Sequence, residues 1–193
     1  MPSTSYTRWS VQQAKALDEI EQAHAAIGGI GRGRRYATQQ VNQAYAVMIA
    51  SQFQGFCRNL HSECVDHLVA AIAPAVQLEP IVRTQFTHGR QLDQRNAQPS
   101  SLGADFGRLG LKFWREVESQ DSRNEQRQTV LTRINNWRNA IAHQDFVASE
   151  LGGTTTVMLK QARGWRRTCN CLARAFDEVM RLHLQSLLGA SPW

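Results

Sequence analysis

Apolar residues recur three and four positions apart along most of the chain, which is the spacing of an amphipathic α-helix. The longest such segment extends from about Tyr36 to Ala73, and its first proline is Pro74, just beyond the end. A helix of this length is expected to form the spine of a bundle, with apolar surface left over for a dimer. Shorter helices are expected over about Trp9–Ile27, Pro80–His88, Asp105–Glu118 and Trp165–Leu188, with one more from Ser122 to Ile141.

Polar and glycine-rich stretches separate these helices. Gly28–Gly33 and the two arginines after it are interpreted as a flexible basic turn, because no strand precedes them as a phosphate-binding loop would require. The polar, aperiodic Gln91–Ser101 is expected to be a loop. Ser122–Glu125 fits a capping box, which starts a helix. Threonine-rich sequence favours one short hairpin or an extended loop near 152–162.

The length of 193 residues and the mass of 21.7 kDa suit one domain with its own core and are short for two. No shift in composition marks a boundary, so residues 1–193 are expected to form a single all-α domain, an up-and-down bundle of five or six helices. The most hydrophobic segment, Leu68–Val76, is far shorter than the ~18–20 apolar residues that span a bilayer. With no apolar secretory signal at the start, we expect no membrane association and a cytoplasmic location.

The charge of the chain is basic, with 22 Lys and Arg against 16 Asp and Glu, which gives +6 at pH 7. Only Lys15, Lys112 and Lys160 are lysines, so arginine supplies nearly all the positive charge. The guanidinium presents a planar fork of donors that fits phosphate oxygens. A GC-rich genome would enrich arginine too, so the charge permits a nucleic-acid partner without requiring one.

Cysteine and histidine share one face of the longest expected helix, at Cys57, His61, Cys64 and His67. Four ligands strung over ten residues would span roughly 15 Å, whereas zinc gathers its ligands within about 2.0–2.3 Å. Apolar residues lie on the same face, so core packing explains the stripe. We therefore expect no metal and no cofactor.

A short polar motif, Asn136-Trp-Arg-Asn-Ala-Ile-Ala-His143, ends the helix that begins at Ser122. Arg138 and His143 are separated by four residues, and Asn139 follows the arginine directly. This arrangement resembles the signature of the HEPN family, an all-helical family in which many members are ribonucleases with an Arg-x4–6-His motif. The resemblance covers the motif and, more loosely, a helical bundle over most of the chain.

The resemblance implies an RNA substrate and a homodimer whose two Arg/His pairs form one site. It also implies a role as a toxin or antiviral defence effector, with an antitoxin or other regulatory partner. In some family toxins a tyrosine two residues beyond the histidine is modified by such a partner. Asp145 stands at that position here, so that route of inactivation is not expected.

The chemistry of the three motif residues agrees with RNA cleavage by attack of a 2′-OH on the adjacent phosphorus. His143 can exchange protons near neutral pH. Arg138 stays protonated and can grip the phosphate oxygens, and Asn139 can position the scissile group. Five residues along a helix turn through about 500°, which leaves Arg138 and His143 about 140° apart. Either the helix loosens near His143, or the two side chains act from opposite sides of a shared cleft.

Two alternatives compete with this interpretation. Arg83 and His88 have the same spacing, although Thr84 after the arginine fits the family pattern less well than Asn139 does. The chain is alternatively a catalytically silent helical module that binds RNA, a nucleotide or a partner protein. A DNA-binding regulator is disfavoured, because no helix shows a set of base-reading side chains.

Overall fold

The computed structural model describes residues 1–28, 35–73 and 75–193. Within these residues it has helices and no strand, so the all-α class is confirmed and the hairpin alternative near 152–162 is wrong. The helices number seven rather than five or six when the first one, which a π-helical turn divides, is counted once. Their bounds are α1 Thr4–Arg8, the π turn Trp9–Gln13, α2 Ala14–Gly28, α3 Arg35–Ile72, α4 Glu79–Thr87, α5 Pro99–Gly107, α6 Phe113–Gln120, α7 Arg123–His143 and α8 Leu159–Leu188. The basic turn expected at Gly28–Gly33 lies, from residue 29 on, outside the described residues.

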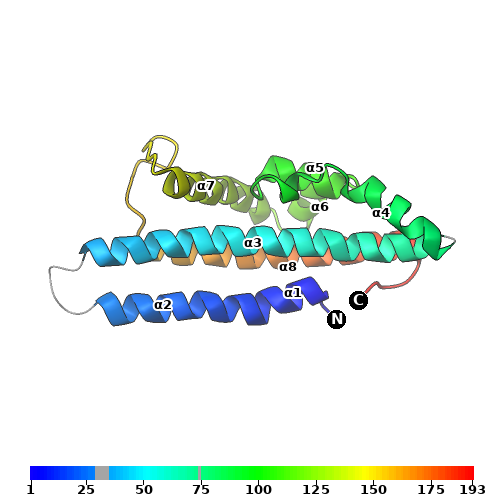
Figure 1. Ribbon diagram of the computed structural model, residues 1–193, viewed down its shortest axis with the longest axis horizontal. Coiled ribbons are helices and arrows are strands. Elements are labelled where there is room, and N and C mark those ends of the chain that lie inside the picture. Colours follow the sequence, from blue (N-terminus) through cyan, green and yellow to red (C-terminus); the bar gives the residue numbers. More distant parts are fainter. Residues whose placement is uncertain (29–34, 74) are drawn as a thin grey trace.

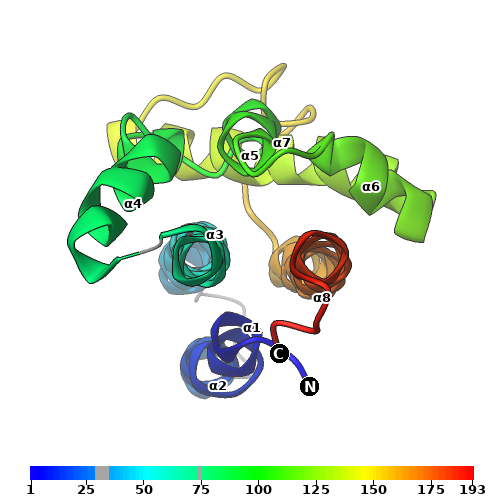
Figure 2. The ribbon, with the colours of Figure 1, turned by 90° about the vertical axis from the view of Figure 1, so that its right-hand side faces the viewer.

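The helices form three layers, which Figure 2 shows along the long axis of the molecule. The parallel helices α3 and α8 lie side by side in the middle, α1 and α2 cover one face, and α4 to α7 cover the other (Figures 1 and 2). α3 packs most extensively against α8 and next against α2. None of the described helices is both long and apolar enough to cross a membrane.

The spine helix predicted from about Tyr36 to Ala73 is confirmed as α3, Arg35–Ile72. Its cysteines belong to the core, since Cys57 and Cys64 are fully buried and burial raises the pKa of both thiols well above the ordinary range. In the described part of the chain, no three His, Cys, Asp or Glu side chains gather as metal ligands would. The buried residues of α3 include Tyr45, Ile49, Phe53, Phe56, Cys57, Leu60, Cys64 and Leu68.

The helix expected over Asp105–Glu118 is two helices, α5 and α6. They are separated by a turn at Gly110, whose φ of 91° lies in the left-handed region that glycine adopts without steric cost. The loop expected over Gln91–Ser101 is correspondingly shorter. A 3-10 turn occupies Gln91–Asp93, and α5 begins at Pro99.

The capping box expected at Ser122–Glu125 does not form. Ser122 makes no side-chain cap hydrogen bond. Asp121 replaces it, because its Oδ1 accepts from the backbone N–H of Arg123 at 3.0 Å. Hydrogen bonds from the guanidinium groups of Arg123 and Arg127 hold the pKa of Asp121 well below its ordinary range.

A buried polar network joins α3 to the segment before α5. His61 is fully buried, with Nε2 3.1 Å from the backbone carbonyl oxygen of Asp105 and Nδ1 3.4 Å from Nη1 of Arg90. Because the guanidinium only donates, Nδ1 is the acceptor and Nε2 carries the proton. Burial and the neighbouring Arg90 charge lower the pKa of His61 from 6.5 to about 4. The fold therefore holds His61 as the neutral imidazole.

The depressed pKa of His61 predicts a loss of stability in mild acid. Between pH 6.5 and about 4 the unfolded chain binds a proton at this histidine and the folded chain does not. The free energy of unfolding should therefore decrease as the pH is lowered through this window, by about 3 kcal/mol in total. Urea unfolding at several pH values measures it. The variant His61→Gln should show a flatter profile there, whereas His24→Gln, on the outer layer, should keep the wild-type profile.

Candidate active site

The three motif residues lie in the last two turns of α7, and buried neighbours determine how this helix is rotated. Trp137 is fully buried and its Nε1 donates to the carbonyl oxygen of Leu151 at 3.1 Å. Asn135, also buried, donates from Nδ2 to the carbonyl oxygen of Ala97 at 3.0 Å. With these residues and Ala140 inward, Arg138 and Asn139 are half-buried and His143 is exposed.

The helix stays α-helical through His143 and ends directly after it. Gln144 adopts a left-handed conformation, with φ 56° and ψ 33°, and its backbone N–H donates to the carbonyl oxygen of Ala140. The sequence left two geometries open, and the regular helix excludes the first of them, in which the helix loosens near His143. Arg138 and His143 point in different directions from a regular helix.

Asn139 lies between these two side chains, and its amide orientation is determined by two donors. Its Oδ1 accepts from Nη1 of Arg138 at 3.2 Å and from Nδ2 of Asn96 at 2.7 Å. The Oδ1 atom is thereby engaged, and the Nδ2 group forms no hydrogen bond with another described residue. Asn139 can therefore donate to a ligand while it remains tied to Arg138.

A surface hollow of about 200 Å³ lies beside His143. Asn139 and His143 both line it, whereas Arg138 does not. The structure thus brings the asparagine and the histidine to one hollow and leaves the arginine outside it, hydrogen-bonded to Asn139. The full lining is Asn136, Asn139, Ala140, His143, Asp145, Val147, Glu150 and Leu151.

The competing pair on α4 is less well placed. Arg83 forms an ion pair with Asp66 on α3. His88 follows the last residue of α4, and its carbonyl oxygen accepts a hydrogen bond from Arg108. Neither Arg83 nor His88 lines the hollow beside the motif or the larger hollow described next.

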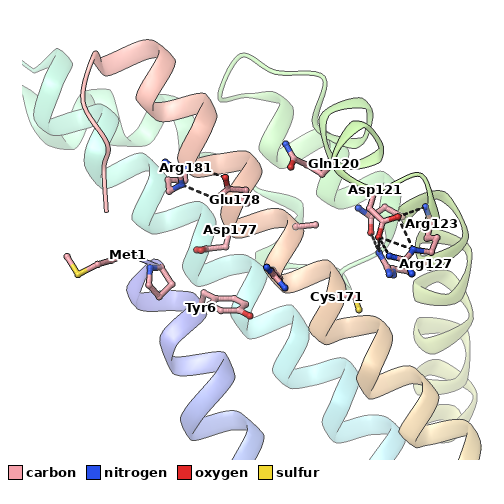
Figure 3. A pocket seen from close by; sticks show the side chains of 14 residues that line it. Met1, Tyr6, Gln120, Asp121, Arg123, Arg127, Cys171, Asp177, Glu178 and Arg181 are labelled. Atoms are coloured by element: carbon pink, nitrogen blue, oxygen red, sulfur yellow. Dashed lines mark hydrogen bonds and ion pairs between the residues drawn. The ribbon is translucent and has the colours of Figure 1, made fainter.

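The larger hollow, of about 750 Å³, lies near the first turns of α7. Four arginines line it, and Figure 3 shows that three of them lie beside carboxylates: Arg123 and Arg127 share Asp121, and Arg181 binds Glu178. Arg127 is the last residue of α7 that lines this hollow, and Arg138 follows it by 11 positions, so about 16 Å of helix separates the hollow from the motif. It is therefore a separate feature, and most of its guanidinium groups are already neutralised.

Two arginines near the start of α8 form ion pairs with acidic side chains of α2. Arg163 and Arg166 bind Glu21, at 2.8 and 3.5 Å, and Arg166 also binds Asp18 at 2.7 Å. Tyr45 donates to Glu21 in the same cluster, and burial together with this hydrogen bond raises the pKa of Tyr45 to about 12. The cluster holds α2, α3 and α8 together.

Two parts of the site were missed by sequence reasoning. Asn96 was assigned to an unspecified polar loop, and its contact with Asn139 spans 43 positions, which no local pattern reveals. The wall formed by Val147, Glu150 and Leu151 lies between two of the expected helices, in a segment to which the sequence assigned no element. Tryptophan at 137 offered a weak signal, because a buried indole N–H needs an acceptor from another segment.

Comparisons with known proteins provide no relative for this chain. No family model, curated protein or solved structure matches it. The similarity to the HEPN signature rests on the motif residues and the helical bundle alone, so function is argued from the geometry and chemistry of the site.

Proposed function

We propose that the chain is a metal-independent endoribonuclease of HEPN type, which cleaves RNA by attack of the 2′-OH on the adjacent phosphorus. The observation that carries the proposal is the arrangement of three polar residues in two helical turns. His143 is exposed beside a hollow, Asn139 lines the same hollow, and Arg138 is hydrogen-bonded to Asn139. Each side chain suits one requirement of the reaction.

The roles follow from the donor and acceptor properties of each group. The imidazole of His143 transfers protons to or from the 2′-OH or the leaving 5′-oxygen. The guanidinium of Arg138 stabilises charge on the phosphate, and its hydrogen bond orients Asn139. The Nδ2 group of Asn139, which has no partner among the described residues, donates to a non-bridging oxygen.

The reaction needs an acid and a base at once, and one histidine cannot supply both in a single step. A second copy of the chain would provide the second His143, which is consistent with its exposed position at the end of α7. A two-fold contact of this kind also brings in a second Arg138, on the far side of the cleft from the first His143. The proposal therefore includes a homodimer with a shared site.

The biological role that accompanies the proposal is that of a toxin or antiviral defence effector. Such an enzyme requires restraint, so an antitoxin or other regulatory partner is part of the proposal. Asp145 in place of a modifiable tyrosine favours a restraint that acts by binding rather than by modification of that position.

One observation favours the alternative of a catalytically silent module that binds RNA, a nucleotide or a protein. Arg138 is half-buried, tied to Asn139 and absent from the hollow that His143 lines. A purely structural arginine would be placed in the same way. The two functions differ in whether RNA is cut.

The proposal predicts RNA cleavage in the presence of EDTA. Purified protein is incubated with total tRNA and with a long single strand, and the product ends are analysed. We expect fragments with 2′,3′-cyclic phosphate and 5′-OH ends, because the 2′-OH is the nucleophile and no metal takes part. Absence of cleavage, or cleavage that EDTA abolishes, would contradict the proposal, and RNA binding without cleavage would favour the silent module.

A further inference from the structure

The hollow beside His143 is lined in a way that suits a nucleobase better than a phosphate. Its volume of about 200 Å³ equals the space of roughly seven water molecules at about 30 Å³ each. That is smaller than a typical pocket for a drug-sized ligand, which starts near 300 Å³. A single planar ring system fits such a space, with its sugar and phosphate outside.

The polar lining of the hollow includes two acidic residues in a chain that is basic overall. Asp145 and Glu150 are exposed, and neither carboxylate forms an ion pair or hydrogen bond within the described residues. Two unpaired carboxylates repel phosphate, so the scissile phosphate belongs on the side of Arg138. Ionised carboxylates only accept hydrogen bonds, so the matching ligand presents donors.

Hydrogen bonds hold the wall that carries Glu150 in a defined position. The turn at 147–151 is closed by backbone hydrogen bonds from Glu150 to Val147, at 3.0 Å, and from Leu151 to Ala148, at 3.2 Å. α7 anchors it through Trp137, which donates to the Leu151 carbonyl oxygen, and through Asn136, which donates to that of Glu150 at 3.4 Å.

The turn after this wall requires glycine. At Gly152 φ is 86°, and a Cβ atom there would lie 3.3 Å from Nε of Arg133. The wall is therefore held against the same helix that carries His143.

We propose that this hollow binds the base next to the scissile phosphate and favours guanine. Guanine presents N1–H and the N2 amino group side by side, which matches carboxylate acceptors. Adenine and cytosine pair one amino donor with a ring acceptor, and uracil places one N–H between two carbonyl acceptors that carboxylates repel. Val147 and Leu151 supply apolar contact for the ring. The inference rests on the proposed function, since it assigns the substrate preference of that site.

The first test measures cleavage of short RNAs that differ only in the base at one cleavable position. We expect guanine to be preferred over uracil by about ten- to a hundredfold in cleavage rate, with adenine and cytosine between them. Asp145→Asn and Glu150→Gln should each reduce the guanine preference, because an amide replaces one acceptor with a donor. Glu125→Gln also removes one negative charge, but on the exposed side of α7 and about 27 Å along the helix from His143. It should leave the guanine preference as in wild type.

The second test measures equilibrium binding of guanosine and uridine 3′-monophosphates by isothermal titration calorimetry. The inference predicts tighter guanosine binding by wild type and by His143→Ala, and loss of the difference in Asp145→Asn. Equal binding or equal cleavage of the two bases overturns the guanine subsite, even if RNA is cut. Guanosine-selective binding without any cleavage by wild type keeps the subsite and overturns the nuclease function.

Discussion

Replacement of His143 by alanine is expected to lower the rate of RNA cleavage by about 10²- to 10⁴-fold, the usual contribution of a positioned acid or base. The side chain is exposed and forms no hydrogen bond within the described residues, so its removal should leave the free energy of unfolding within about 0.5 kcal/mol of wild type. Initial cleavage rates in EDTA, with urea unfolding of the same samples, measure both effects.

The matched control for this prediction is His88→Ala, which removes the exposed histidine of the competing pair. We expect it to cut RNA at the wild-type rate; a reversed outcome would transfer the catalytic role to Arg83 and His88.

The shared site is tested by co-expressing wild type with His143→Ala at equal levels. Random assortment leaves about a quarter of the dimers with two histidines, so total activity should fall to about a quarter, whereas independent protomers would retain half.

Replacement of Asp105 by alanine is expected to have the largest effect on stability, lowering the free energy of unfolding by about 3–5 kcal/mol. The Asp105 side chain is fully buried, and its two oxygens accept the backbone N–H groups of Gln91 and Leu92 at 2.9 and 2.8 Å. Alanine would leave both donors without a partner in the interior, and hydrogen bonds to carboxylates are worth about 1.5–3 kcal/mol each. The midpoint of urea unfolding should fall with little change in its slope.

Asp93 provides the matched control for Asp105. Its carboxylate lies in the same segment but is 42% exposed, where it pairs with Arg90 at 2.7 Å. Because Arg90 is buried and donates two hydrogen bonds to Asp93, Asp93→Ala should cost about 1–2 kcal/mol, which is more than for an exposed ion pair and less than for Asp105→Ala. If both variants lose the same stability, the hydrogen bonds to Gln91 and Leu92 do not anchor the segment as described.

The Asp105 variant should also affect the candidate site. The segment that Asp105 anchors continues to Asn96, whose Nδ2 orients the amide of Asn139. A loosened segment therefore changes the donor that Asn139 offers to a phosphate, although Asp105 itself lies outside the hollow.

The longest helices could be predicted from sequence because their apolar periodicity is regular over many turns. The α3 spine was placed within about a residue at each end. The start of α8 was missed: it begins at Leu159 rather than Trp165, because Ala162 is buried and one glycine at 164 costs only about 1 kcal/mol in a helix. The break at Gly110 was missed because five residues of turn between two short apolar helices preserve the overall spacing.

The site could be predicted only where it consists of neighbouring residues. Arg138, Asn139 and His143 share two turns of one helix, so their spacing identifies them as a group. The partner Asn96 and the wall at Glu150 come from other segments, and their positions depend on tertiary hydrogen bonds rather than on helical period. The same limit applies to the start of α7, where Asp121 rather than the capping-box serine accepts the first amide.

The central position of α8 has a consequence for how the protein is made. α3 finds its most extensive contact on α8, and the N-terminal layer also depends on it, since Ser3 donates its backbone N–H to Asp177 and Trp9 donates to Asn170. In the order of synthesis α8 follows every other described helix. On the ribosome, therefore, α3 and α7 emerge before the helix that buries their inner faces, and the core closes only after the last turns of α8 have left the exit tunnel. A nuclease built in this way would stay inert until α8 has emerged from the ribosome.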